Sequence, residues 1–371
     1  MKEGYIRRFF PGGNTSKGYI SFFDNVLPWE NAKKFFIMKG GPGVGKSTFI
    51  QKIGERLVRD GIDIEFLHCS ADSNSLDGVI LPEYGIALID GTAPHIVDPK
   101  YPGCVEEIIN FGDSWDEEGI IKHKSDIIKL QKEISRCYKK GFDYIKTAKV
   151  LYDGIQEIYF WATDEGKLNK IIEEIVGDIF CNVTRIGRIP RQRKMFASAI
   201  TSGGLINFLD NNFGNIEKRY ILKGEITWAK AKLIETVLNT ALIKGFGVEA
   251  FYCPLSPERV EHIIIKDLNV GLINSVGPHV FSEIKNNDRL IDFGDLLIQP
   301  DFEKHRKDVE FSREICDRLL DEAVECFTEA KKLHDELEGF YVANMDFAKI
   351  DEKLEYIYKI LINLIVESGS E

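Results

Sequence analysis

The chain has 371 residues, of which 44% are hydrophobic and 29% charged, which is typical of a globular protein of about two domains. Its net charge of −11 disfavours a general nucleic-acid binder, because such proteins displace counterions with basic surfaces. No apolar run approaches the ~20 residues of a membrane-spanning helix, and the first residues lack the apolar core of a signal peptide. Seven scattered cysteines without C-x-x-C spacing indicate reduced thiols. We therefore expect a cytoplasmic protein with no membrane partner.

A glycine-rich loop lies between a predicted strand, residues 34–38, and a predicted helix, residues 46–59. The loop and the start of the helix have the pattern G-x-x-x-x-G-K-[ST] in the strand–loop–helix setting that this motif requires. Glycines let successive backbone N–H groups turn inward around an anion, and the positive end of the helix dipole adds to this attraction. The pattern predicts that a nucleoside triphosphate binds here.

The residues of this motif have separate expected roles. Lys46 would reach the β- and γ-phosphates, and the hydroxyl of Ser47 would ligate Mg²⁺. ATP and Mg²⁺ are therefore the expected cofactors, with ATP preferred over GTP because no N-K-x-D guanine motif is present. The predicted nucleotide-binding set is Gly40, Gly41, Pro42, Gly43, Val44, Gly45, Lys46, Ser47 and Thr48.

Two further strands are predicted at residues 62–69 and 85–90, and both are followed by polar loops. Continuous apolar runs of this kind suit parallel strands that helices cover on both faces. We therefore predict a doubly wound α/β domain with a parallel sheet, whose ligand lies at the carboxyl ends of the strands. Asp90 ends the second of these strands, where a carboxylate would hold Mg²⁺ beside Ser47 and act as a catalytic residue with Lys46. The alternative is a turn aspartate.

The residue that would activate water is less evident, because Gly91 follows Asp90 where many P-loop ATPases have a glutamate. Asp72 and Asp77, in the loop after the preceding strand, could position water or a substrate hydroxyl. Either could instead cap a following helix. His95 titrates in a useful range, but its counterpart His279 survives in the other half of the chain, which favours a structural role.

The remainder of each half is predicted to be helical. Apolar residues keep a three-to-four spacing over residues 127–158 and 315–340, and shorter helices follow at about 166–179 and 346–366. We expect each pair to form a long helical hairpin that packs on its own sheet or projects from it. The hairpin either only contributes apolar residues to the hydrophobic core, or also forms a lid over the site or a surface that binds a partner.

An internal duplication fills the chain. The segments at residues 15–25, 39–40, 88–90 and 111–113 return at an offset that stays between about 182 and 186 residues. We predict two tandem P-loop NTPase-like domains, residues 1–188 and 189–371, which pack as an intramolecular pseudo-dimer.

The second repeat has lost the motif. The residues at the loop and metal positions are now Glu225, Thr227, Ala229, Ala231 and Asn274. Added Cβ atoms hinder the positive-φ turns of an anion-binding nest, and alanine cannot ligate Mg²⁺. Lys230 survives, and we expect it on a solvated helix face. This half would act as a scaffold, a regulatory partner or a contributor to the first site.

Basic residues at 185–194, and the pair Arg7 and Arg8, could stabilise charge on a transferred phosphoryl group. They could also be ordinary linker residues.

These motifs resemble those of a family of bacterial tandem P-loop ATPases, whose two-repeat members share GGPGVGKST, HCS-x-D-x-x-SLDG and DGTAPH, here residues 40–48, 68–78 and 90–95. The resemblance covers essentially the whole chain and implies nucleotide binding, but no further substrate. The leading hypothesis is a Mg²⁺-dependent ATPase with one competent site in the first repeat. The alternatives are a small-molecule kinase and a nucleotide-gated protein-binding module with little turnover.

Overall fold

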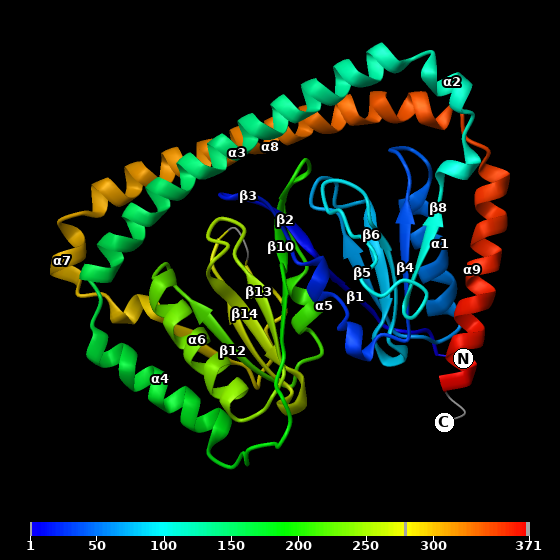
Figure 1. Ribbon diagram of the computed structural model, residues 1–371. Helices are drawn as coiled ribbons and strands as arrows, with labels where there is room; N and C mark the ends of the chain where they lie inside the picture. Colours follow the sequence, from blue (N-terminus) through cyan, green and yellow to red (C-terminus); the bar gives the residue numbers. More distant parts are fainter. Residues whose placement is uncertain (1, 278–279, 369–371) are drawn as a thin grey trace.

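The structure is a computed structural model that describes residues 2–277 and 280–368. It contains two similar α/β domains, each built on a six-stranded sheet, and two long helices that run across both (Figure 1). Two small antiparallel hairpins, β2–β3 and β10–β11, lie between the sheets; their strands are β2 (Gly12–Thr15), β3 (Gly18–Ser21), β10 (Ser198–Thr201) and β11 (Gly204–Asn207).

The first sheet is mixed, not parallel as predicted. In spatial order its strands are β1 (Ile6–Phe9), β5 (Ile64–His68), β6 (Leu76–Leu81), β7 (Ile86–Asp90), β4 (Lys34–Lys39) and β8 (Glu106–Asn110). Strand β6 is antiparallel to both β5 and β7, and the other pairs are parallel. The chain reverses within a tight loop, where the N–H of Cys69 bonds the carbonyl of Ser75 at 3.0 Å. So short a connection can join only antiparallel neighbours.

The second sheet repeats this arrangement, so the two domains are similar. Its order is β9 (Gln192–Met195), β13 (Val248–Tyr252), β14 (Val260–Ile265), β15 (Val270–Asn274), β12 (Lys218–Lys223) and β16 (Arg289–Asp292), again with the third strand antiparallel to its neighbours. The two sheets share a core that includes Phe9, Phe35, Ile221 and Phe251.

Helix α1 (Lys46–Arg59) has the predicted bounds, and α6 (Thr227–Ile243) is its counterpart. Phe49, Ile50, Ile53 and Leu57 are buried on α1 and recur at helical spacing, so one stripe of the helix packs against the sheet. A short helix, α5 (Leu209–Phe213), precedes β12.

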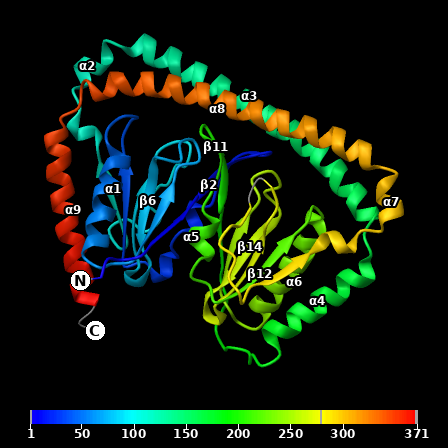
Figure 2. The same ribbon diagram turned by 180° about the vertical axis from the view of Figure 1, so that it is seen from behind.

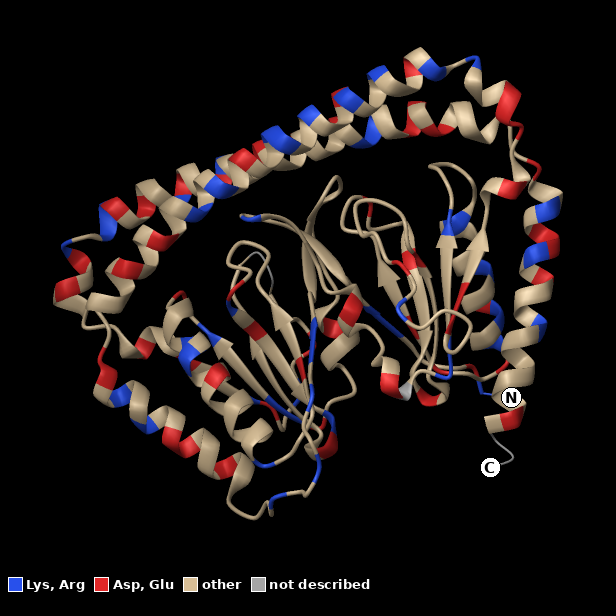
Figure 3. Ribbon diagram, viewed as in Figure 1, with Lys and Arg blue, Asp and Glu red and all other residues tan. Residues whose placement is uncertain are grey.

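Helices α3 (Lys124–Trp161) and α8 (Arg306–Val342) lie side by side and antiparallel above both sheets, as the two opposite views show (Figures 1 and 2). The short helices α2 (Glu117–Ile121) and α7 (Gln299–Glu303) precede them. Basic and acidic residues alternate along both long helices (Figure 3). Within residues 2–277 and 280–368, no helix combines the length and the apolar character needed to cross a bilayer.

The helix after each long helix covers the sheet of the other repeat. Helix α4 (Glu165–Phe180) packs against α6, with Leu168 and Ile175 in the core of the second domain. Helix α9 (Phe347–Ser368) packs against α1, with Leu354 and Leu361 in the core of the first. The predicted hairpins within each repeat are therefore wrong, because α3 and α8 carry the chain across to the opposite sheet. A boundary at residue 188 separates the two sheets but not their covering helices.

Candidate functional site

The glycine-rich loop connects β4 to α1 at the carboxyl edge of the first sheet. Gly43 and Gly45 have φ values of +67° and +90°, a region that strains any residue with a Cβ atom. These two positions explain why the loop needs glycine. The backbone can therefore turn its N–H groups toward a common centre, as an anion site requires.

The side chain of Lys46 folds back over this loop. Its Nζ donates to the carbonyl oxygens of Gly40 at 3.0 Å and Gly41 at 2.8 Å, and lies 3.5 Å from Oδ2 of Asp90. Lys46 is only 9% exposed, so these oxygens replace much of the hydration of its ammonium group. The structure thus brings together Lys46 and Asp90, two residues that the sequence placed 44 positions apart.

Ser47 and Asp90 are also held in place. Ser47 Oγ accepts the N–H of Leu76 in β6 at 2.9 Å, and Asp90 Oδ1 accepts the N–H and hydroxyl of Thr92 at 2.9 and 2.6 Å. Oδ2 of Asp90 faces Lys46. A hydroxyl and a carboxylate beside a lysine-lined glycine loop are the donor types that Mg²⁺ and a phosphate would use. The donor set fits the expected metal and nucleotide.

Asp72 is engaged by other partners. Its Oδ1 accepts the N–H of Asn74 at 3.0 Å in a local turn, and its Oδ2 lies 3.2 Å from Nζ of Lys331 on α8. The helix-cap alternative for Asp72 and Asp77 is wrong, because strand β6 follows the loop and Asp77 lies within it. The sequence did not reveal this strand, because Asp77 and Gly78 interrupt its apolar pattern.

Asp77 is a buried carboxyl group beside the site. Burial raises the pKa of Asp77 to about 6, and the nearby charge of Asp90 adds to this rise, while His95 and Lys46 act to lower it. Nε2 of His95 lies 4.0 Å from Oδ1 of Asp77, and the imidazole stacks on Phe23. Neither ring nitrogen of the buried His95 has a hydrogen-bond partner among the described residues. Asp77 therefore changes protonation state at about pH 6, and the charges of Asp90 and Lys46 both influence it.

The C-terminal end of α8 lies on the glycine-rich loop, which the sequence did not predict. Oε1 of Glu338 accepts the backbone N–H of Gly43 at 3.2 Å. A Cβ atom on Gly41 would lie 2.8 Å from the ring of Tyr341, and one on Gly45 would lie 3.4 Å from the ring of Phe347. Almost 300 residues separate Gly43 from Glu338, so no local pattern could have indicated the contact.

The corresponding loop of the second repeat is covered in the same way by α3. Oε1 of Gln156 accepts the N–H groups of Thr227 at 3.0 Å and Trp228 at 3.3 Å. Lys230 is fully buried, not solvated as predicted, and its Nζ bonds the carbonyl of Gly224. Burial lowers the pKa of Lys230 to about 8, against the opposing effect of Glu225 and Glu261. The lysine keeps its structural contact in a loop that lacks the other site residues.

The basic residues serve other contacts. Arg7 and Arg193 lie between the sheets, where both guanidinium groups bond Glu65 and Glu249. Arg191 pairs with Glu30 on the surface. The predicted role of Arg7 and Arg193 in phosphoryl transfer is therefore wrong, because buried carboxylates already engage both side chains.

No protein-family model, curated protein or solved structure matched this chain. The resemblance to tandem P-loop ATPases stays a prediction from the motifs.

Proposed function

We propose that the protein binds ATP with Mg²⁺ at the glycine-rich loop of the first repeat and hydrolyses it. The observation that carries this proposal is the position of Lys46, which lies over a loop with two positive-φ glycines and 3.5 Å from Asp90. A buried ammonium group, a glycine-rich loop and a carboxylate are groups that phosphoryl transfer uses for charge stabilisation.

Each residue would have a defined part in this reaction. The N–H groups of the loop and the ammonium of Lys46 would bind the phosphates, exchanging the carbonyls of Gly40 and Gly41 for phosphate oxygens. Ser47 and Asp90 would hold Mg²⁺, which neutralises charge on the β- and γ-phosphates when bound. Asp77 would accept a proton from the attacking group, because its pKa of about 6 leaves it largely ionised at neutral pH.

A small-molecule kinase is the second candidate. Gly91 follows Asp90, so the water-activating glutamate of many P-loop ATPases is absent from that position. Phosphate release into water without any acceptor would favour the ATPase, whereas release or transfer only with an acceptor would favour the kinase. Tight binding with negligible turnover in either assay would favour a nucleotide-gated binding module.

Thermal unfolding with and without Mg²⁺-ATP tests the binding step. A ligand at about 100 times its dissociation constant stabilises the folded state by roughly 2.7 kcal/mol, so the wild-type melting temperature should rise. Lys46→Ala should abolish this rise. Lys52→Ala is the matched control, because Lys52 is a half-exposed lysine of the same helix that pairs with Asp351.

Binding of one nucleotide per chain is expected, because only the first loop has the full set of residues. An unchanged nucleotide-induced rise in Lys46→Ala, or two nucleotides per chain, would contradict the proposal.

A further inference from the structure

We infer that the carboxylate of Glu338 competes with a phosphate group for the loop of the first repeat, so that nucleotide binding displaces the C-terminal end of α8. This inference rests on the proposed nucleotide site. It assigns to the second repeat the control of access to the first.

The contact places a negative group where an anion is expected. The N–H of Gly43, a loop glycine with a φ of +67°, donates to Oε1 of Glu338 at 3.2 Å, and the backbone N–H groups of such a loop are the expected donors to a phosphate. One backbone N–H cannot serve both a carboxylate and a phosphate oxygen at full strength. Nucleotide and Glu338 therefore exclude one another at this donor.

The main chain of α8 is also close to the loop. A Cβ atom on Gly43 would lie 2.9 Å from the carbonyl oxygen of Glu338, and Tyr341 of α8 and Phe347 at the start of α9 lie near Gly41 and Gly45. A change in the Glu338 side chain alone would leave this cover in place. Phosphates that fill the loop would therefore also collide with the main chain at the C-terminal end of α8.

Comparison of the two repeats supports a role for charge. Gln156 and Glu338 are separated by 182 residues, the offset of the internal duplication, and both bond backbone N–H groups of the loop that they cover. The loop that lost the counterparts of Gly41, Gly43 and Gly45 is covered by a neutral amide. The loop that kept them is covered by a carboxylate, the group that resembles phosphate in charge.

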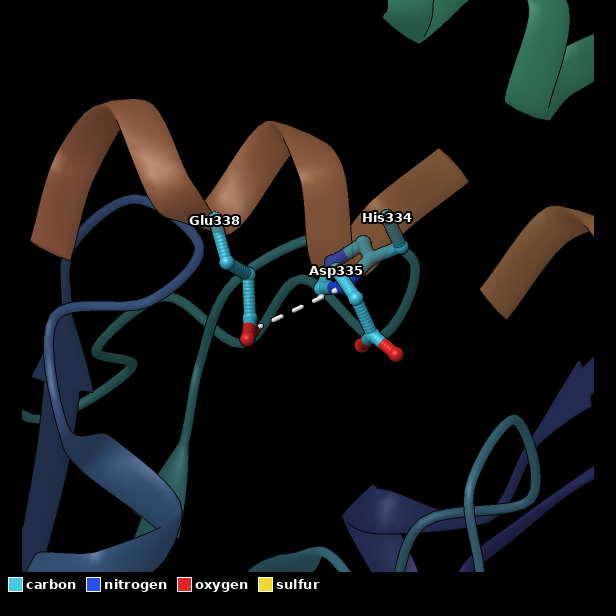
Figure 4. Close-up of side chains that lie close together, drawn as sticks. All are labelled: His334, Asp335 and Glu338. Carbon is cyan, nitrogen blue, oxygen red and sulfur yellow. Dashed lines mark ion pairs between the residues drawn. The ribbon is translucent and has the colours of Figure 1, made fainter. Parts of the chain in front are cut away.

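The neighbours of Glu338 show how the helix end is held and how it could be released. Nδ1 of His334 lies 3.6 Å from Oε1 of Glu338, one turn away on the same helix (Figure 4). Besides the hydrogen bond from Gly43 to Glu338, an ion pair holds this end of α8 to the first repeat. Nζ of Lys331 lies 3.2 Å from Oδ2 of Asp72, in the loop that follows β5. Glu338 is 38% exposed, so solvent can receive its carboxylate once the loop releases it.

The decisive experiment measures the affinity for Mg²⁺-ATP by calorimetry in Glu338→Ala and Glu338→Gln. Both changes remove the competing charge, so both should bind nucleotide at least about fivefold more tightly than wild type. Glu336→Gln is the matched control, because Glu336 is exposed and lies about 200° around the helix from Glu338. Its affinity should not change.

Hydrogen exchange adds two readouts, the first of which needs no nucleotide. Without ligand, Glu338→Ala should speed exchange in the loop peptide that contains Gly43. In wild type, saturating Mg²⁺-ATP should speed exchange at residues 331–342 of α8. Slower exchange there would overturn the inference, because it would mean that nucleotide binds with the helix end closed.

The affinity results separate this inference from the proposed function. Equal affinities in wild type and the Glu338 variants would overturn the competition and leave nucleotide binding standing. Weaker affinity or slower turnover in the variants would also overturn it, because Glu338 would then assist the nucleotide or the attacking water. An absence of binding in every variant would overturn the nucleotide site and the inference with it.

Discussion

Arg7 and Glu249 form an ion pair between the two repeats, with Nη2 of the arginine 2.8 Å from Oε2 of the glutamate. The pairing is reciprocal, because Arg193 of the second repeat lies 2.6 Å from Glu65 of the first. Both carboxylates are at most 5% exposed. Burial acts to raise the pKa of Glu249, but Arg7, Lys266 and Arg193 hold it well below its usual range.

Arg7→Met should destabilise the protein by about 3–5 kcal/mol, because it leaves buried carboxylates with less compensating charge. The free energy of unfolding in urea at pH 7 measures this loss. Arg191→Met is the control, since Arg191 and Glu30 form an exposed pair worth less than about 1 kcal/mol. A loss for Arg7→Met as small as that of the control would show that this cluster contributes little to joining the repeats.

Asp77→Asn should stabilise the protein at neutral pH. A carboxyl whose pKa is raised to about 6 binds its proton more tightly in the folded state than in the unfolded state. Stability contributed by this group is therefore present below about pH 4 and is lost as the pH rises to about 6. Above that range the ionised carboxylate costs about 3 kcal/mol, which asparagine avoids.

The stability difference between Asp77→Asn and wild type, measured by urea unfolding from pH 4 to pH 8, should grow by about this amount. A difference that stays constant with pH would contradict the prediction. If Asp77 is also the proton acceptor, the same variant should lose phosphate release while it keeps nucleotide binding.

Two glycines of α3 should respond oppositely to alanine. A Cβ atom on Gly141 would lie 2.5 Å from Cε1 of the buried Phe327 of α8, so Gly141→Ala should cost about 1–3 kcal/mol through overpacking. Gly154 has open space at its Cβ position, so Gly154→Ala should stabilise the helix by roughly 0.5–1 kcal/mol. Thermal unfolding of both variants compares them directly. Stabilisation by both would mean that α3 and α8 are less closely packed at Gly141 than the structure has them.

A fragment of residues 1–188 should not fold on its own. It lacks α9, whose Leu354 and Leu361 complete the first core, and it carries α4, whose apolar face belongs against the second sheet. Exposed apolar helix faces of this kind favour aggregation. Co-expression with residues 189–371 should restore a soluble complex of one copy of each, detected by affinity purification through a tag on either half. A stable monomeric 1–188 fragment with cooperative unfolding would contradict the exchange of helices.

The parts that the sequence predicted correctly depend on neighbours along the chain. Strand β4, helix α1 and strand β7 were recognisable from an apolar run, a helical spacing and a terminal Asp90. The sequence does not indicate strand β6, because a buried Asp77 resembles a loop residue until its surroundings are known. Nor does it indicate that Lys230 is buried, because a lysine is buried only when distant groups compensate for its lost hydration.

By itself, the sequence determined that two copies of one α/β unit follow each other and that only the first keeps a complete glycine-rich loop. These properties depend on the identities of residues and on the short spacings between them, and both can be read directly from the sequence. The tertiary structure alone decided that α4 and α9 exchange sheets and that Glu338 meets Gly43. An amphipathic stripe indicates that one face of a helix is buried. It does not indicate which surface covers that face, because the hydrophobic effect has no direction. The path of α3 and α8 across both domains determines which sheet α4 and α9 cover.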